Sequence, residues 1–312
     1  MLFRNFMFAS VGCIVLAAPG FGSTLKGGVV YKDGDQIVTK TGEIEYTEAN
    51  IASLKLRLSE AENLADKVKF KKFDLENRSV IGVEALIRWD HPTRGLVNPV
   101  DFIPAAEDTD LILPIGRWVL NEACQQGAVW HAAGYHVAMS VNVSSRQLAD
   151  DAIIEDVRTA LATSGLRPGS LILEVTESAI MEDAMATAAR LAGLKTLGVR
   201  IAIDDFGTGY SSLAYLQQFP VDTLKIDRSF VAAMTDSRES RALVHTLVQL
   251  GKTLGLETIA EGIEETSQLR HLQGEACDAG QGFLFAHPLE PSAATAFFVE
   301  HGIRAEPVVA AL

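Results

Sequence analysis

From about residue 67 onward, the chain alternates between short apolar runs and longer stretches with helical periodicity. Apolar runs of about four to eight residues are typical of buried strands, and apolar residues spaced three and four apart are typical of amphipathic helices. Polar side chains stand at or near the ends of most of these runs. In chain order they are Glu84, Asn142, Glu174, Asp204, Asp205, Lys225, Glu261 and Gln281.

This regularity favours one architecture. In a (β/α)8 barrel the carboxyl ends of the strands meet on the face that holds the active site. In a doubly wound sheet, ligands bind only at the switch point, so fewer units contribute residues. Because so many successive units contribute, the sequence predicts an α/β fold of the TIM-like (β/α)8 barrel type. The dinucleotide motif GxGxxG and the P-loop motif GxxxxGK[ST] do not occur in the chain.

The same pattern places the elements along the chain. Strands are expected at Lys67–Phe73, Val80–Trp89, His136–Val143, Leu171–Val175, Val199–Asp205, Thr223–Ile226 and Glu257–Ala260, with a last short strand reaching Gln281. Helices are expected over residues 48–67, 114–132, 151–164, 183–197, 238–254 and 265–272.

The first 23 residues differ from the rest of the chain. One Arg precedes an apolar run over residues 6–18, and Pro19 and Gly20 follow. This is typical of a secretory leader, and the run is shorter than the roughly 20 residues of a membrane-spanning helix. An apolar start left by a misassigned initiation codon is the alternative. We expect a leader or anchor at 1–23 (the anchor within 6–22), a linker at 24–48 and the folded domain at 49–300.

Composition limits the classes of partner. The formal net charge of −13 argues against binding to polymeric nucleic acid, which requires a basic surface. The negative net charge is compatible with a small phosphate ligand held through metal ions, because the ions supply the positive charge. The three cysteines, at positions 13, 124 and 277, form no CxxC motif. Reduced thiols and a cytoplasmic domain are therefore expected.

Asp204 and Asp205 follow an apolar run and precede a glycine-rich loop. Two adjacent aspartates most often form a solvated turn. At the end of a buried strand, however, an unpaired carboxylate is costly unless a cation or another partner offsets its charge. Metal binding is therefore the leading hypothesis for this pair.

The other strand-end residues extend the hypothesis. Carboxylate and amide oxygens suit Mg²⁺ or Mn²⁺ better than they suit metals bound by Cys and His. Together with Glu261, there are enough oxygens for two ions that share a carboxylate. Two ions about 3.5–4 Å apart commonly promote the attack of water on a phosphodiester. Lys225 could orient that water or neutralise charge on the phosphate. Any one of these residues alone is more often a surface ion-pair or capping residue.

Seven segments, in order, carry a family resemblance. They are Glu84-Ala85-Leu86, Val141-Asn142-Val143-Ser144, Glu174-Val175-Thr176-Glu177, Asp204-Asp205-Phe206-Gly207-Thr208-Gly209, Leu224-Lys225-Ile226-Asp227, Ala260-Glu261-Gly262 and Gln281-Gly282-Phe283. Over about residues 74–292 the chain resembles the EAL-domain family, whose phosphodiesterases linearise cyclic di-GMP to pGpG.

The resemblance implies a barrel whose first strand runs antiparallel to the others, and two bound ions, Mg²⁺ or Mn²⁺. The residues it assigns to the metals are Glu84, Asn142, Glu174 and Asp204 for one ion, and Asp204 and Asp205 for the other. Glu261 would be a general base or a metal ligand. Lys225 would hold the water or the second metal, and Gln281 would support the base or the lysine.

The resemblance also implies residues that meet the substrate. Arg88 would contact a phosphate of cyclic di-GMP, and Asp227 would take part in substrate binding. The loop over residues 206–212, which begins at Phe206 and Gly207, resembles the family loop that couples dimerisation to metal binding. Glu177 would tether this loop, and a homodimer is one expected assembly.

The first strand departs from the family pattern. Where the family has Tyr-Gln-Pro, this chain has Lys69-Phe70-Lys71, so Phe70 replaces a Gln that contacts the substrate. The loss of that contact is expected to weaken substrate binding more than it slows the chemical step. Replacing Phe70 by Gln should therefore lower KM more than it raises kcat.

This departure leaves two further hypotheses beside the enzyme. One is a weakly active or inactive receptor that binds cyclic di-GMP or a partner protein. The other, suggested by the leader alone, is an exported hydrolase of a different phosphodiester. The complete set of carboxylates favours the phosphodiesterase.

Overall fold

The computed structural model describes residues 67–76, 79–91, 94–208 and 216–300, together with six short strands between residues 6 and 47. The chain divides into two compact units. Met1–Asp66 and Ile87–Trp118 form the first, and Lys67–Leu86 and Val119–Leu312 form the second. The helix expected over residues 48–67 lies outside the described residues, apart from its last residue, Lys67, which begins a strand.

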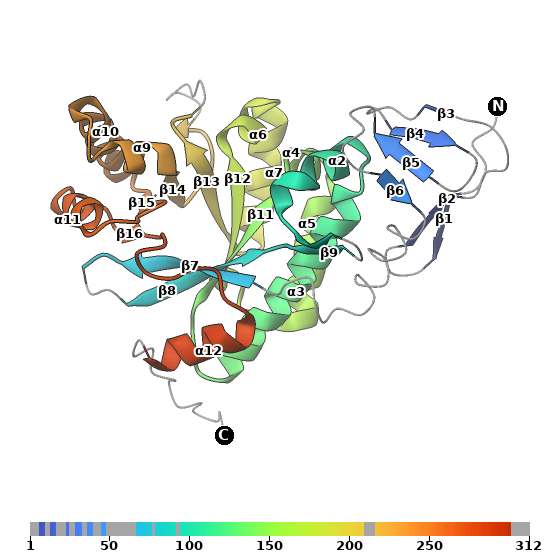
Figure 1. Ribbon diagram of the computed structural model, residues 1–312, viewed down its shortest axis with the longest axis horizontal. Helices are drawn as coiled ribbons and strands as arrows, with labels where there is room; N and C mark the ends of the chain where they lie inside the picture. Colours follow the sequence, from blue (N-terminus) through green and yellow to red (C-terminus); the bar gives the residue numbers. More distant parts are fainter. Residues whose placement is uncertain are drawn as a thin grey trace. The chain divides into compact units, whose positions relative to one another are not determined.

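The second unit is built on a closed barrel (Figure 1). Its strands are β7 (Lys67–Asp74), β8 (Val80–Leu86), β11 (Ala138–Val143), β12 (Leu171–Thr176), β13 (Arg200–Phe206), β14 (Thr223–Ile226), β15 (Glu257–Ala260) and β16 (Ala279–Gly280). β7 runs antiparallel to both of its neighbours, β8 and β16, and all other pairs are parallel. The predicted TIM-like barrel with an antiparallel first strand is confirmed.

Helices follow most of the parallel strands. The longer ones are α3 (Ile112–Ala132), α5 (Ala152–Ser164), α7 (Ala184–Thr196), α10 (Arg238–Leu254), α11 (Thr266–Gly274) and α12 (Pro291–Glu300). Shorter ones at the strand ends are α4 (Ser145–Ala149), α6 (Glu177–Met181) and α9 (Arg228–Ala233), and the 3-10 turn η2 (Pro168–Ser170) precedes β12. The sequence predicted most of the long helices to within a few residues but not the short ones, which offer too few turns for a periodicity to be detected.

Helix α5 illustrates how the sequence determines the outer layer. Ile153, Val157, Ala160 and Leu161 are buried, and they recur at the spacing of one helical face. The helix ends where Gly165 takes a left-handed φ of 74°, a conformation in which glycine carries no steric penalty.

One predicted strand is too long. The sequence predicted a strand from Val80 to Trp89, whereas β8 ends at Leu86. Trp89 instead packs on Phe102, with ring centroids 5.9 Å apart, in a small core of the first unit. Apolar residues continue beyond Leu86, so the sequence pattern does not show where the chain changes from one core to another.

Apart from the start of α3, the other described elements of the first unit are short. Near this small core lie β9 (Trp89–His91), β10 (Gly95–Val97), η1 (Pro99–Asp101) and α2 (Ile103–Asp108). Nearer the amino terminus, β1 (Phe6–Ala9) pairs with β2 (Cys13–Leu16). β3 (Ser23–Thr24), β4 (Val29–Lys32), β5 (Gln36–Thr39) and β6 (Glu45–Thr47) form an antiparallel sheet.

The predicted leader and linker stay predictions, because most of residues 1–66 lie outside the described part of the chain. Among the helices that the structure does describe, none is long and apolar enough to cross a membrane.

Candidate active site

Lys225 stands at the centre of an acidic cluster inside the barrel. The cluster comprises the carboxylates at the ends of β8, β12, β13 and β15, which are Glu84, Glu174, Asp204, Asp205 and Glu261. The ammonium of Lys225 lies 3.0 Å from Oε2 of Glu174 and 2.5 Å from Oε1 of Glu261, and it also donates to Asp204. Lys225 has no exposed surface. One lysine therefore bridges three strand ends.

The charge state of Lys225 follows from this contact set. Burial by itself lowers the pKa of Lys225, but the carboxylates of Glu174, Glu261 and Asp204, with Glu84 beyond them, more than offset the effect. They hold the pKa well above its usual value. Lys225 is therefore an ammonium at any physiological pH, and it donates hydrogen bonds without serving as a base.

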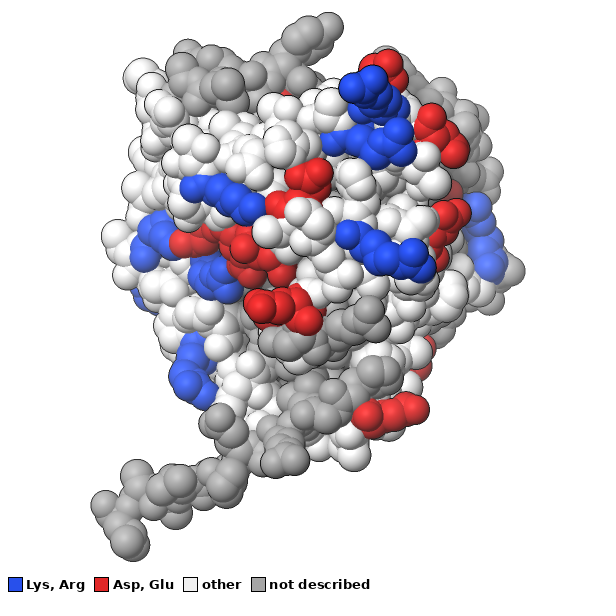
Figure 2. Space-filling model, turned by 90° about the vertical axis from the view of Figure 1, so that its left-hand side faces the viewer, with Lys and Arg blue, Asp and Glu red and all other residues white. Residues whose placement is uncertain are grey.

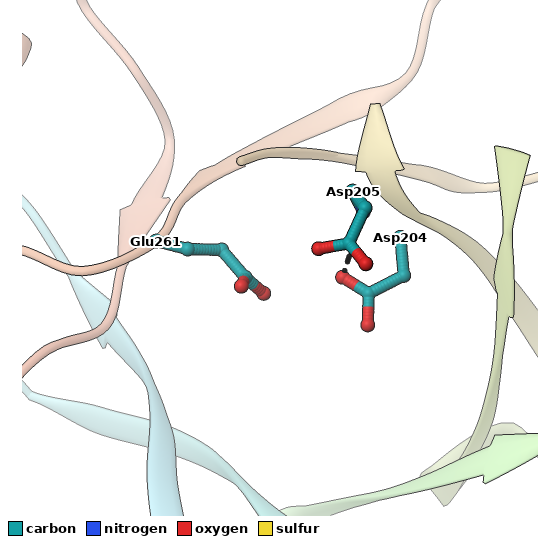
Figure 3. Close-up of side chains that lie close together, drawn as sticks. All are labelled: Asp204, Asp205 and Glu261. Carbon is teal, nitrogen blue, oxygen red and sulfur yellow. Dashed lines mark hydrogen bonds between the residues drawn. The ribbon is translucent and has the colours of Figure 1, made fainter. Parts of the chain in front are cut away.

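A bulge allows two consecutive aspartates to face the same site. Successive side chains of a regular strand point to opposite faces, so Asp204 and Asp205 should diverge. Instead, the register between β13 and β14 shifts between Ile203 and Phe206, and Asp205 has a φ of 52°. Such a bulge turns a side chain towards the neighbouring site. One carboxylate oxygen from each of Asp204, Asp205 and Glu261 then falls in a group less than 4.8 Å across (Figure 3).

Asp205 is also close to Asp227, the residue that caps α9. The side chain of Asp227 accepts a hydrogen bond from the main-chain N–H of Ser229 at 3.0 Å. The pKa of Asp205 is raised by partial burial, by the charges of Asp204 and Asp227 and by a hydrogen bond with Asp227, and Lys225 only partly opposes this. Asp205 thus ionises less readily than an exposed aspartate, and a cation beside it would oppose this effect.

Glu84 and Asn142 extend the cluster across β8 and β11. The amide Nδ2 of Asn142 donates to Oε1 of Glu84 at 2.5 Å. Asn142 is directly opposite Glu174 in the register of β11 and β12. This contact leaves the carbonyl oxygen of the Asn142 amide as an acceptor beside the carboxylates.

Gln281 is held by the main chain at the end of β16. Its N–H donates to Ala260 O at 2.9 Å, and its carbonyl accepts from Ile263 N at 2.9 Å. The side chain is 1% exposed, and its Oε1 atom has no hydrogen-bond partner among the described residues. A buried acceptor of this kind costs free energy unless a further group satisfies it.

Glu177 and Gly207 connect the site to α6. Oε2 of Glu177 accepts a hydrogen bond from the N–H of Gly207 at 2.9 Å, two residues after the aspartate pair. Glu177 is 3% exposed, and with the buried ring of Phe206 it borders a small apolar cavity that is also lined by Ile180 and Phe219. The predicted tether therefore exists at the start of the loop. Residues 209–215, which complete the loop, lie outside the described residues.

Two predicted site residues lie outside the described part of the second unit. Arg88 belongs to the first unit, where its guanidinium donates to Ile87 O at 2.7 Å. The side chain of Phe70 lies outside the described part of the chain, although the main chain of β7 follows the predicted strand. The assignments of both residues remain predictions.

Two features of the site were missed by sequence reasoning. The sequence predicted Lys225 near a phosphate or a water, and the structure shows its ammonium among carboxylates. The sequence also gave no indication of how two adjacent aspartates reach one site. Gly207, two residues after Asp205, is the one local hint of irregular backbone. A burial pattern predicts which strand end a residue occupies, but not which atoms it meets.

The donor set fits a divalent metal of the hard class. Among the described residues, Asp204, Asp205 and Glu261 converge on one point, Glu174 joins Asp204 and Glu261 around the ammonium of Lys225, and Asn142 contacts Glu84 at its edge. Mg²⁺ and Mn²⁺ prefer ligands of this kind, and sulfur and imidazole are absent from this cluster as described. The excess of negative charge is what a divalent ion would neutralise.

Sequence comparison decides the family. The sequence profile of the EAL domain matches residues 60–288. The chain belongs to the EAL domain family. The chain is 47% identical to the bifunctional diguanylate cyclase/cyclic di-GMP phosphodiesterase MucR of Pseudomonas aeruginosa over 214 residues. The aligned region covers 68% of this chain and 31% of MucR. It is also 39% identical to the signaling protein YkoW of Bacillus subtilis over 229 residues, and this alignment covers 73% of this chain and 29% of YkoW.

Solved structures of EAL domains resemble the barrel. The PaMucR phosphodiesterase in complex with c-di-GMP has 42% identity and a TM-score of 0.74, covering 79% of this chain and 99% of that one. The EAL domain of Mycobacterium smegmatis DcpA has 32% identity and a TM-score of 0.64, and the match covers 77% of this chain and 98% of that one. The match is complete for these isolated domains, whereas this chain spans about a third of the full-length relatives above.

Proposed function

We propose that this EAL domain is a Mg²⁺- or Mn²⁺-dependent phosphodiesterase that hydrolyses cyclic di-GMP to linear pGpG and so lowers the level of this second messenger. The observation that carries the proposal is the convergence of Asp204, Asp205 and Glu261 on one point beside Lys225. Similarity to MucR, whose name includes cyclic di-GMP phosphodiesterase, supports the substrate.

The carboxylates would divide between two metal ions. Glu84, Asn142, Glu174 and Asp204 would hold one ion, and Asp204 and Asp205 would hold the second. When bound, such ions activate water and neutralise charge on the phosphate. The hydrogen bond from Asn142 to Glu84 orients the Glu84 carboxylate towards the cluster.

Glu261 and Lys225 have complementary tasks. The ammonium of Lys225 lies against Glu261 and favours its ionised form, so that Glu261 is available to accept a proton from water. The same ammonium presents a fixed positive charge where negative charge develops on the phosphate oxygens. Gln281, with its buried and unpartnered Oε1, would accept a hydrogen bond from a water or a ligand in the site.

Substrate contacts are proposed for Arg88 and Asp227. Arg88 would pair with a substrate phosphate, for which a guanidinium is suited because it donates two parallel hydrogen bonds. Asp227 lies beside Asp205 and caps α9, so it would accept a hydrogen bond from the substrate at the rim of the metal cluster.

Two properties of the whole protein are also proposed. The first is a homodimer whose assembly is coupled to metal binding through the loop after β13, the start of which is held by the hydrogen bond between Glu177 and Gly207. Sedimentation velocity with and without Mg²⁺ tests this. A cytoplasmic position of the domain follows from the substrate, and phosphodiesterase assays on cell fractions test it.

A catalytically weak cyclic di-GMP receptor is the alternative. The observation that favours it is Phe70 in β7, at the position of the family Gln that contacts the substrate. It predicts binding of the dinucleotide with little or no turnover.

The deciding experiment follows the release of pGpG from cyclic di-GMP by chromatography, using the purified full chain with Mg²⁺ or Mn²⁺. Turnover that is abolished by a chelator and by Glu84→Ala or Asp204→Ala supports the phosphodiesterase. Glu155→Ala, which removes an exposed carboxylate paired with Arg158 on α5, is the matched control and should retain full activity. Binding without turnover would transfer the protein to the receptor class, and wild-type turnover in Asp204→Ala would contradict the metal assignment.

A further inference from the structure

The relative position of Glu261 and Gln281 depends on a very short pair of strands. β15 has four residues and β16 has two, and they pair at two positions, of which the second joins Ala260 to Gly280. Glu261 and Gln281 directly follow these two residues in the chain. A slip of one residue in the pairing would turn the side chains of β16, and Gln281 with them, to the other face of the barrel wall. Two paired positions specify a register weakly, so a further contact is needed to hold it.

That contact lies at the start of β16, where Asp278 meets Thr258 of β15. Oδ2 of Asp278 accepts hydrogen bonds from the N–H of Thr258 at 2.8 Å and from its hydroxyl at 2.7 Å. The N–H of Asp278 in turn donates to the same hydroxyl oxygen at 3.3 Å. The thiol of Cys277 donates to the carbonyl of Thr258, with 3.6 Å between Sγ and the oxygen. The N–H, the carbonyl and the hydroxyl of Thr258 are therefore all bonded by two consecutive residues at the start of β16.

Packing fixes the conformation of Thr258. The residue is fully buried, and a Cβ added at Gly251 of α10 would lie 2.2 Å from its methyl carbon Cγ2. The methyl group therefore occupies the space next to Gly251. Because the methyl and the hydroxyl of a threonine are both bonded to Cβ, holding one of them in place also holds the other. Thr258 thus presents its hydroxyl to Asp278 in one orientation.

Asp278 also holds the other edge of β16. Its carbonyl accepts a hydrogen bond from the N–H of Leu75 at 3.3 Å. Leu75 directly follows Asp74, which pairs with Ala279 where the antiparallel strand β7 closes the barrel (Figure 1). β16 is thus tied to β15 by the side chain of Asp278 and to β7 by its main chain. Asp278 is not among the carboxylates that act on Lys225, so it can affect the site only through β16.

Asp278 is an exposed residue, and an exposed carboxylate can also belong to a surface that attracts a charged partner. Figure 2, which faces the side of the molecule that carries α10 and α11, shows acidic side chains gathered near its centre with Lys and Arg on either side. The described residues on this face therefore do not form a field of one sign, which would steer a highly charged partner. The hydrogen bonds to Thr258 are the better explanation for Asp278.

We propose that Asp278 and Thr258 are a pair of positioning residues that set the register of β16 against β15 and so place Gln281 beside Glu261. This role rests on the proposed phosphodiesterase, in which Glu261 accepts a proton from water and Gln281 accepts a hydrogen bond from a water or a ligand. The placement of these groups matters more in the transition state than in the bound substrate. Loss of the pair should therefore lower kcat and leave KM nearly unchanged.

The first test measures kcat and KM of full-chain variants with cyclic di-GMP and saturating Mg²⁺. Thr258→Val keeps the shape of the side chain and removes the hydroxyl, and it should lower kcat about ten-fold or more with KM within about two-fold of wild type. Thr258→Ser keeps the hydroxyl and should recover part of the loss. Thr223→Val is the matched control, because Thr223 is also fully buried and its hydroxyl donates to the carboxylate of Glu257 at 3.3 Å. β14 and β15 pair at four positions, so this control should retain the wild-type kcat. Equal kcat in Thr258→Val and Thr223→Val would overturn the proposal.

The second test needs no turnover, so it separates a failure of this pair from a failure of the phosphodiesterase. Hydrogen–deuterium exchange with mass spectrometry reports the protection of the Gln281 N–H, which donates to the carbonyl of Ala260. The peptide that contains Gln281 should exchange faster in Asp278→Ala and in Thr258→Val than in wild type, and at the wild-type rate in Thr223→Val. If Asp278→Ala does not fold, Thr258→Val carries both readouts. The expected exchange in a chain without turnover would support the pair and contradict the phosphodiesterase alone. Wild-type exchange at Gln281 in the folded Asp278→Ala and Thr258→Val variants would overturn the pair.

Discussion

The ammonium of Lys225 lies 3.0 Å from the carboxylate of Glu174 in the interior of the barrel, and each side chain has only 1% of its surface exposed. Neither charge can be hydrated there, so each depends on the other and on the carboxylates around them. Removing one partner of such a pair is more damaging than replacing both, because it leaves an unpaired charge in a medium of low polarity.

Lys225→Met should therefore destabilise the metal-free protein by roughly 3–5 kcal/mol. Mg²⁺ should restore part of this loss by neutralising the same carboxylates. Urea unfolding at pH 7 with EDTA and with Mg²⁺ measures both effects. Lys252→Met, on the exposed side of α10, is the control and should lie within about 1 kcal/mol of wild type. Equal stability of the two variants in EDTA would contradict the account of Lys225.

The pKa of Lys225 also predicts a pH dependence. Its folded-state pKa is raised well above the usual value, so its stabilising contribution is complete below the unfolded pKa of about 10.4 and is lost as the pH rises through the folded pKa. The difference in stability between wild type and Lys225→Met should thus be constant between pH 7 and 9 and shrink only in strong alkali. A difference that already disappears by pH 9 would show that Lys225 is not held as an ammonium.

Gly207→Ala tests the start of the loop after β13. Gly207 has a φ of 100°, and an added Cβ would come within 2.8 Å of the Phe230 ring. Gly255 has a φ of 69° with nothing within 4 Å, so Gly255→Ala carries backbone strain alone, roughly 1–2 kcal/mol. We expect Gly207→Ala to cost more in unfolding free energy and also to raise the Mg²⁺ concentration for half-maximal activity, because it moves Asp205. Identical behaviour of the two variants would show that the loop tolerates the change.

Gly282→Ala tests the support of Gln281. A Cβ at Gly282 would lie 2.0 Å from Ile263 O and 2.3 Å from Ile263 N, which are main-chain atoms that cannot give way like the end of a side chain. Because Gln281 and Ile263 are joined by a backbone hydrogen bond, the substitution should displace Gln281 and lower kcat or prevent folding. Gly274→Ala, with open space around the added carbon, should leave kcat unchanged. An active and stable Gly282→Ala would contradict this packing.

The two thiols of the barrel unit should be inert in the native protein. Burial raises the pKa of Cys124 to about 12 and that of Cys277 to about 11, so neither forms the reactive thiolate near pH 8. In a Cys13→Ser variant, iodoacetamide should label neither cysteine until urea unfolds the chain. Mass spectrometry of the labelled peptides measures this, and rapid labelling of native Cys277 would show that β16 opens readily.

The sequence by itself determined the class of fold and which charged residues stand at the ends of the strands. Alternating apolar runs specify strands and helices locally, and a polar residue at the end of each strand can satisfy its charge only where strand ends converge. The order of residues alone therefore assigns Glu84, Glu174, Asp204 and Glu261 to one face. The recurrence of a polar residue at successive strand ends also predicted a closed barrel, because in a barrel the carboxyl ends of the strands meet on one face.

The tertiary structure decided how those residues meet. Asp204 and Asp205 reach one site only through a bulge with a left-handed Asp205, and Lys225 contacts carboxylates at the ends of three different strands. The hydrogen bond between His245 and Glu275 likewise joins α10 to the end of α11, although the two residues are 30 positions apart in sequence. Such contacts depend on register and on backbone conformation at single residues. A local pattern of apolar and polar residues does not encode those quantities, because many registers satisfy the same pattern and only packing of the whole barrel selects one.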